Sequence, residues 1–235
     1  MTFDQVKLVE VARLNSRKIR SVRPLSKQLF IYGDSIIDNG NYVGSNEPHV
    51  AQQISSLLSD WDVISFATDG ARCADIAVQL KENPAPSDAH ILLTGGGNDA
   101  LDTMWVLEDD TDRTFPEVLG LLVNIKEQFR TKYLEVLAEI KNRQTLVATI
   151  YNPMFEHPST EPIKKPSVGM LTAFNDVIQE EACAAGHSIL ELRRLFIHAE
   201  HFANPIEPSA LGGAVIANAT TDWLAHQKKP LMPRA

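Results

Sequence analysis

The chain has 235 residues, of which 44% are hydrophobic, and it carries a formal net charge of −8. This length suits one well-buried α/β domain, and the acidic charge argues against general affinity for nucleic acid or for an anionic membrane surface. No apolar run approaches the roughly 18 residues that span a bilayer, and the N-terminus lacks the compact apolar segment of a secretory signal. We therefore expect a cytoplasmic protein with no nucleic-acid or membrane partner.

Residues 1–27 differ in charge from the rest of the chain. They contain seven Lys or Arg residues and two acidic ones, a net of +5, which leaves about −13 on residues 28–235. A transit peptide can be this basic, but it avoids acidic residues, and two occur here among the first ten. We expect a basic N-terminal extension at 1–27 that packs against the acidic body or against the partner subunit of a homo-oligomer, followed by one domain at 28–228.

Short apolar segments alternate with helical patterns along the domain. Strands are predicted at 29–32, 62–66, 89–94, 145–151 and 188–192. Helices between the strands imply parallel neighbours joined by right-handed crossovers. The pattern predicts a three-layer α/β/α sandwich around a five-stranded, mostly parallel sheet in the flavodoxin-like order 2-1-3-4-5. The proline-containing segment 154–166 is predicted to be a long irregular loop beside the ligand crevice.

Small and polar residues follow the first three predicted strands. Gly33-Asp34-Ser35 ends the first strand, Gly70 follows the second, and Gly97-Asn98-Asp99 follows the third. Glycine lets the backbone turn sharply, which leaves a serine at the carboxyl end of the first strand. In open α/β sheets this edge is where ligands bind.

The order and separation of these three blocks resemble the SGNH/GDSL hydrolase family, over about residues 28 to 220. The resemblance implies the SGNH hydrolase fold and an ester substrate with a short acyl or acetyl group. It also implies Ser35 as the nucleophile, with Asp34 supporting it. The backbone N–H groups of Ser35 and Gly70 and the side-chain amide of Asn98 would form an oxyanion hole for the tetrahedral intermediate.

The last block departs from the family pattern. SGNH hydrolases usually have Asp-x-x-His before the final helix, whereas this chain has Asn204 and Glu207 at the corresponding positions. Three explanations stay open. Glu207 could be the base, raised in pKa by burial and oriented by Asn204; His198 or His201 could supply the base instead; or the protein could bind a ligand in a retained pocket and hydrolyse nothing.

No cofactor or metal is implied by the sequence. The two cysteines lack a metal-type spacing, and the acidic run at 108–112 is interpreted as a solvated loop. The three glycines at 95–97 are accompanied neither by the lysine and hydroxyl of a Walker A loop nor by a Gly-x-Gly-x-x-Gly spacing. A nucleotide-binding protein is therefore disfavoured, and the expected partner is a small-molecule ester or acylated substrate.

Overall fold

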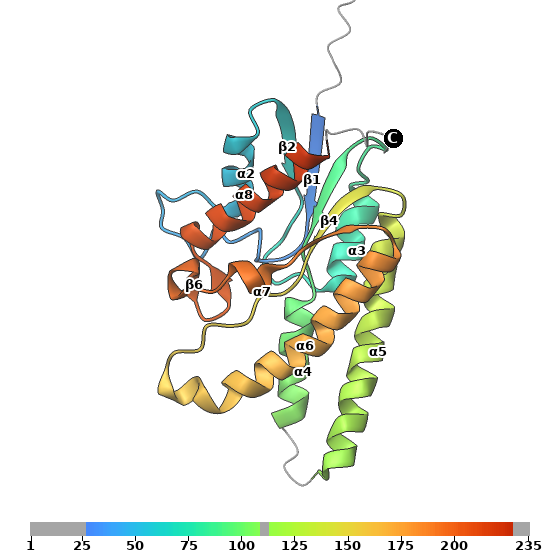
Figure 1. Ribbon diagram of the computed structural model, residues 1–235, viewed down its shortest axis with the longest axis vertical. Helices are drawn as coiled ribbons and strands as arrows, with labels where there is room; N and C mark the ends of the chain where they lie inside the picture. Colours follow the sequence, from blue (N-terminus) through green and yellow to red (C-terminus); the bar gives the residue numbers. More distant parts are fainter. Residues whose placement is uncertain (1–26, 109–112, 228–235) are drawn as a thin grey trace, which may run out of the picture.

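A computed structural model describes residues 27–108 and 113–227. The basic extension predicted for 1–27 lies outside the described residues, apart from Lys27, and so do three acidic residues of the predicted 108–112 loop. A five-stranded sheet forms the centre of the molecule, in the order β2-β1-β3-β4-β5 (Figure 1). All four neighbouring pairs are parallel, which confirms the predicted topology. The strands are β1 (Lys27–Tyr32), β2 (Trp61–Ser65), β3 (His90–Leu93), β4 (Gln144–Ala148) and β5 (Ser188–Leu190).

The register of the sheet brings the carboxyl ends of the central strands level with one another. Tyr32 at the end of β1 pairs with Leu93 at the end of β3, and Leu93 pairs with Val147 of β4. The segments that follow these strands therefore begin at one edge. That edge receives the Gly-Asp-Ser block and the Gly-Asn-Asp block.

Alternation along the strands builds two hydrophobic layers, one on each face of the sheet. In β1, Phe30 and Tyr32 belong to one buried cluster, whereas Leu29 and Ile31 belong to the other. The first cluster packs beneath α3, α5 and α6, and the second beneath α2 and α8, so helices cover both faces as predicted (Figure 1). The longer helices are α2 (Val50–Leu57), α3 (Cys73–Glu82), α4 (Gly97–Glu108), α5 (Phe115–Glu139), α6 (Glu161–Ala184) and α8 (Ala210–His226).

Two of these helices are much longer than the strands they cover. With 25 residues in α5 and 24 in α6, each is about 36 Å long, against about 20 Å for the six residues of β1. Figure 1 shows the lower parts of α4, α5 and α6 extending past the sheet on the side where β1 ends. These overhanging helices form a wall beside the edge of the sheet where β1 and β3 end, which we term the functional edge. In the described part of the chain, no helix combines the length and apolar character needed to cross a membrane.

Two elements near this edge differ from the prediction. The segment expected to be an irregular loop to residue 166 turns helical earlier, with η1 (Pro158–Thr160) leading into α6 at Glu161. Pro162 fits because a first-turn N–H has no helical partner, and Pro166 is accommodated inside the helix. A short hairpin of β6 (Phe202–Asn204) and β7 (Glu207–Pro208) was not predicted; it follows α7 (Leu192–Leu195) and η2 (Ala199–His201).

A buried asparagine ties α6 to the chain just after β4. Asn175 is fully buried, its Oδ1 accepts from the backbone N–H of Ile150 at 2.7 Å, and its Nδ2 donates to the carbonyl of the same residue at 2.8 Å. The two bonds satisfy a backbone segment that leaves the sheet and has no strand partner. They also fix the position of Ile150 at the edge of the sheet.

We expect Asn175→Ala to lower the free energy of unfolding by about 2 to 4 kcal/mol, because it leaves one buried N–H and one buried carbonyl without partners. Urea denaturation followed by circular dichroism measures this change. Asn218→Ala, at an exposed position of α8, is the matched control and should change stability by less than about 0.5 kcal/mol. Equal effects of the two substitutions would show that the Ile150 bonds add nothing.

Candidate active site

Ser35 is presented by a tight turn at the end of β1. Gly33 has a φ of +151°, and a Cβ at this position would lie 2.0 Å from Thr94 Oγ1. The backbone at Gly33 is also held by Gln79, whose side chain both donates to its carbonyl and accepts from its N–H, each at 3.0 Å. Only a glycine fits this close approach, and the turn leaves the Ser35 side chain facing a cavity.

Asp34 is buried beside the serine and lines the same cavity. Its Oδ1 accepts from Thr94 Oγ1 at 2.9 Å and from the N–H of Ile36 at 3.2 Å. Burial raises the pKa of Asp34 to about 6, although these hydrogen bonds act in the opposite direction. The Asp34 carboxylate therefore joins Thr94, which follows β3, to the backbone of Ile36, and so holds the turn that carries Ser35.

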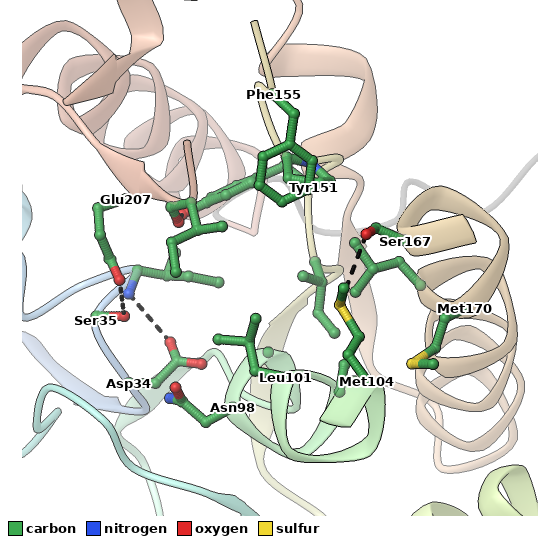
Figure 2. A pocket seen from close by; sticks show the side chains of 17 residues that line it. Asp34, Ser35, Asn98, Leu101, Met104, Tyr151, Phe155, Ser167, Met170 and Glu207 are labelled. Atoms are coloured by element: carbon green, nitrogen blue, oxygen red, sulfur yellow. Dashed lines mark hydrogen bonds between the residues drawn. The ribbon is translucent and has the colours of Figure 1, made fainter. Parts of the chain in front are cut away.

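Glu207 approaches Ser35 from the C-terminal hairpin. Ser35 Oγ donates a hydrogen bond to Glu207 Oε1 at 3.2 Å, and both side chains are buried (Figure 2). The hairpin is fixed around this contact by Asn39, which donates to the carbonyl of Pro208 at 3.0 Å, and by the hydroxyl of Tyr151, which donates to the carbonyl of Ile206 at 2.7 Å. The carboxylate thus reaches the serine from a backbone that is held on both sides.

Asn204 acts on the backbone of this hairpin. Its Oδ1 accepts from the N–H groups of Ile206 and Glu207, both at 3.0 Å. This Asx-type turn fixes the backbone position from which the Glu207 side chain extends. The side chain of Asn204 is therefore a positioning group for the turn, rather than a direct partner of the carboxylate.

The environment of Glu207 changes its acidity. Burial, together with the negative charges of Asp69 and Asp34, raises its pKa to about 7, while the hydrogen bond from Ser35 opposes the shift. Its second oxygen, Oε2, is buried and has no hydrogen-bond partner among the described residues. Near neutral pH the carboxyl group therefore exchanges readily between its charged and neutral forms.

Asn98 lies in the first turn of α4, and Gly70 lies in the loop between β2 and α3. Asn98, near the start of α4, lines the cavity with Ser35, and its Nδ2 donates to the carbonyl of Ala71 at 3.0 Å. An amide nitrogen carries two hydrogens, so this bond leaves Asn98 one further donor. Gly70 precedes Ala71 and has a φ of +79°, but it lines a different surface cavity, beside α3. The Gly70 N–H as a third oxyanion donor stays a prediction.

Apolar side chains make up most of the cavity. Figure 2 shows Asp34, Asn98 and the Ser35–Glu207 pair on one side, Met104 and Met170 on the other, and Leu101 and Phe155 between them. The apolar residues come from α4, from the chain after β4 and from α6. The site therefore joins a hydroxyl, two carboxyl groups and a carboxamide to a hydrophobic chamber, which suits the carbonyl and acyl parts of an ester.

Solved structures share this arrangement of sheet and helices, although no protein-family model and no curated protein matches the sequence. The lipase Lip_vut3 from a goat rumen metagenome has a TM-score of 0.64 at 19% identity, over 83% of this chain and 96% of that chain. The chain has the SGNH/GDSL hydrolase fold.

Two further structures agree with this fold. A lipolytic G-D-S-L family member from Veillonella parvula has a TM-score of 0.59 at 12% identity, over 85% of this chain and 98% of its own. An acetyl xylan esterase has a TM-score of 0.58 at 14% identity, over 84% and 98%. The resemblance predicted from the three sequence blocks is thus confirmed as a likeness of fold, and the chemistry has to be argued from the site.

Neither histidine considered as an alternative base lines the cavity of this SGNH fold. The ring of His201 packs edge-on against Phe196, with ring centres 5.7 Å apart, and against His198 at 5.2 Å. His198 is exposed. The side chain hydrogen-bonded to Ser35 Oγ is that of Glu207, so the geometry favours the carboxylate over either histidine.

The prediction placed segment 154–166 beside the ligand crevice, and Phe155 of this segment lines the chamber. The sequence did not identify Met104 and Met170, which lie on α4 and α6. Their apolar character only indicated burial, because periodicity gives the inner face of a helix but not the neighbour it meets. The contact between Tyr151 and the hairpin was missed for the same reason.

We expect the stability of the wild type, relative to Glu207→Gln, to fall as pH rises from 4.5 to about 7. In this window the unfolded chain has released the Glu207 proton and the folded chain still holds it, so the unfolded state binds fewer protons and raising the pH favours it. The stabilisation that comes from the neutral Glu207 carboxyl is fully present below pH 4.5 and is lost as pH passes about 7.

Urea titrations of both proteins across this window measure the difference in free energy of unfolding. Glu200→Gln, which changes an exposed carboxylate on η2, is the matched control. A wild-type to Glu207→Gln difference that stays constant with pH would show that burial does not hold the proton on Glu207.

Proposed function

We propose that the protein is a serine ester hydrolase in which Ser35 is the nucleophile and Glu207 is the general base. The observation that carries this proposal is the buried hydrogen bond of 3.2 Å from Ser35 Oγ to Glu207 Oε1. A hydroxyl that donates to a fixed acceptor inside a cavity has the arrangement that nucleophilic catalysis needs. The fold shared with lipases and an acetyl xylan esterase supports the same reaction class.

The acidity of Glu207 suits this role. A carboxylate of ordinary pKa is a weak base toward a serine, whereas a general base works best when its pKa lies near the working pH. Burial and neighbouring negative charge bring the pKa of Glu207 to about 7. The group can accept a proton during attack and return it during departure of the alcohol.

The proposed reaction has two balanced halves. Glu207 takes the proton of Ser35 as Oγ bonds to the carbonyl carbon, and the carbonyl oxygen becomes an oxyanion. The N–H of Ser35, the free N–H of the Asn98 amide and the N–H of Gly70 are the proposed donors to this oxygen. Collapse of the intermediate breaks the bond to the alcohol, which leaves with the proton from Glu207. In the second half, Glu207 takes a proton from a water molecule as the water oxygen bonds to the acyl carbon. Glu207 then returns the proton to Ser35 Oγ as the acid is released.

The experiment is hydrolysis of a panel of carboxylic esters by the wild type, Ser35→Ala and Glu207→Gln. Ser35→Ala should reduce turnover to background, and Glu207→Gln should lower kcat/KM by about 10² to 10⁴, the usual contribution of a general base. Glu200→Gln removes an exposed carboxylate a few residues upstream, and this control variant should retain full activity. Turnover that survives Glu207→Gln but not His201→Ala would move the base upstream.

The pH profile gives an independent readout of the same group. We expect wild-type kcat/KM to rise with pH and to level off above about 7, because the charged form of Glu207 is the active one. The Glu207→Gln variant should lose this rise.

A noncatalytic binding protein is the alternative, since the Asp and His of the usual SGNH pattern are replaced. No turnover of any ester, together with no labelling of Ser35 by a fluorophosphonate, would favour that function.

A further inference from the structure

A second hollow lies directly behind the active-site cavity, between the overhanging parts of α4, α5 and α6. It measures about 410 Å³, against about 70 Å³ for the chamber at the serine. Met104, Ser167 and Met170 line both spaces. One layer of side chains therefore separates the chamber from this second space, which we term the distal groove; its lining residues are Met104, Val118, Leu122, Ile163, Pro166, Ser167, Gly169 and Met170.

The described lining of the distal groove is apolar apart from Ser167. Ser167 has the only polar side chain there, and its hydroxyl donates to the carbonyl of Ile163 at 2.6 Å and contacts the Met104 sulfur at 3.6 Å. Among the residues that the structure describes, none of those lining the groove is charged. By contrast, Asp34, Asn98 and Glu207 all lie at the serine end of the first cavity. The two spaces together match a ligand that is polar at one end and hydrocarbon along its length.

We infer that the distal groove holds the far part of the substrate's acyl chain, so that the substrate is an ester of a medium- or long-chain fatty acid. This inference rests on the proposed ester hydrolysis at Ser35. It replaces the short acyl group suggested by the sequence, because an acetyl group would fill only the chamber beside the serine. The apolar walls of the groove would then have no ligand to cover them.

The partition between the two spaces can open with little cost. Met104 is unbranched, with three rotatable bonds, and methionine adapts to irregular apolar space. Gly169 leaves the floor of the groove open, since a Cβ at its position would meet nothing within 4 Å. One turn before the groove residue Val118, α5 exposes a further apolar side chain, Phe115, at 74% exposure. A chain that passes Met104 therefore continues along hydrocarbon surface.

The test uses esters of one alcohol with acyl groups from acetyl to dodecanoyl. Wild-type kcat/KM should rise roughly three- to fourfold for each methylene that the groove buries. Gly169→Phe should fill the groove and lower kcat/KM for the decanoyl and dodecanoyl esters by about tenfold or more, with little change for the acetyl ester.

Gly120→Phe is the matched control for this substitution. Gly120 also lies inside a helix, with open space at its Cβ position, but it does not line the groove. Both exchanges replace a helical glycine, so neither should impair folding. Gly120→Phe should leave the chain-length profile unchanged. An acetyl ester that is hydrolysed best, with no selective effect of Gly169→Phe, would overturn the inference and leave the hydrolase proposal intact.

A binding measurement separates the groove from the catalysis. Calorimetric titration of Ser35→Ala with monodecanoyl glycerol, below its critical micelle concentration, should show binding that adding Gly169→Phe weakens and adding Gly120→Phe does not. This result, with no turnover of any ester by the wild type, would support the groove and reject the proposed hydrolysis. Binding that is equal in the two double variants, or absent, would reject the groove.

Discussion

The hydrogen bond from Ser35 to Glu207 joins residues that are 172 positions apart, and the functional edge is organised around it. On one side, the turn after β1 is fixed by Gly33, which fits against Thr94 where no other residue would. On the other side, the β6–β7 hairpin is held by hydrogen bonds from Asn39 and Tyr151. Neither segment belongs to the sheet, so the contact depends on side chains that bind backbone groups of distant loops. Such a contact is specific in geometry because each end is held independently.

The carboxyl base that we propose would give the site different electrostatics from those of a histidine base. Once it has accepted the serine proton, a histidine is positively charged and attracts the oxyanion, whereas a glutamate becomes neutral and adds no such attraction. In the proposed mechanism, the oxyanion would therefore be stabilised by the backbone and Asn98 donors alone. Asp34, whose pKa is itself raised to about 6, places a second carboxyl group nearby. Burial is the main reason why the pKa of Glu207 is raised to about 7, and the negative charges of Asp69 and Asp34 act in the same direction.

Much of this architecture could be predicted from local features of the sequence. Apolar runs ending in Gly-Asp-Ser or Gly-Asn-Asp marked strand ends, and helical connections required parallel neighbours, so the strand order and the edge with Ser35 and Asn98 could be predicted. The hairpin that presents Glu207 could not, because β7 has only two residues and its position is set by Asn204, Asn39 and Tyr151. The helical start at Glu161 was hidden by prolines that a first turn tolerates.

The length of the helices links the fold to the choice of substrate. The sheet fixes where Ser35 and Asn98 lie, and its buried layers leave little freedom for change. The parts of α4, α5 and α6 beyond the sheet are free of that constraint, since they pack mainly against one another. A substitution at Gly169 or Met104 would alter the space behind the serine without disturbing the strands that position the serine. If both proposals hold, chemistry and selectivity depend on different parts of the structure, which meet where Met104, Ser167 and Met170 line both spaces.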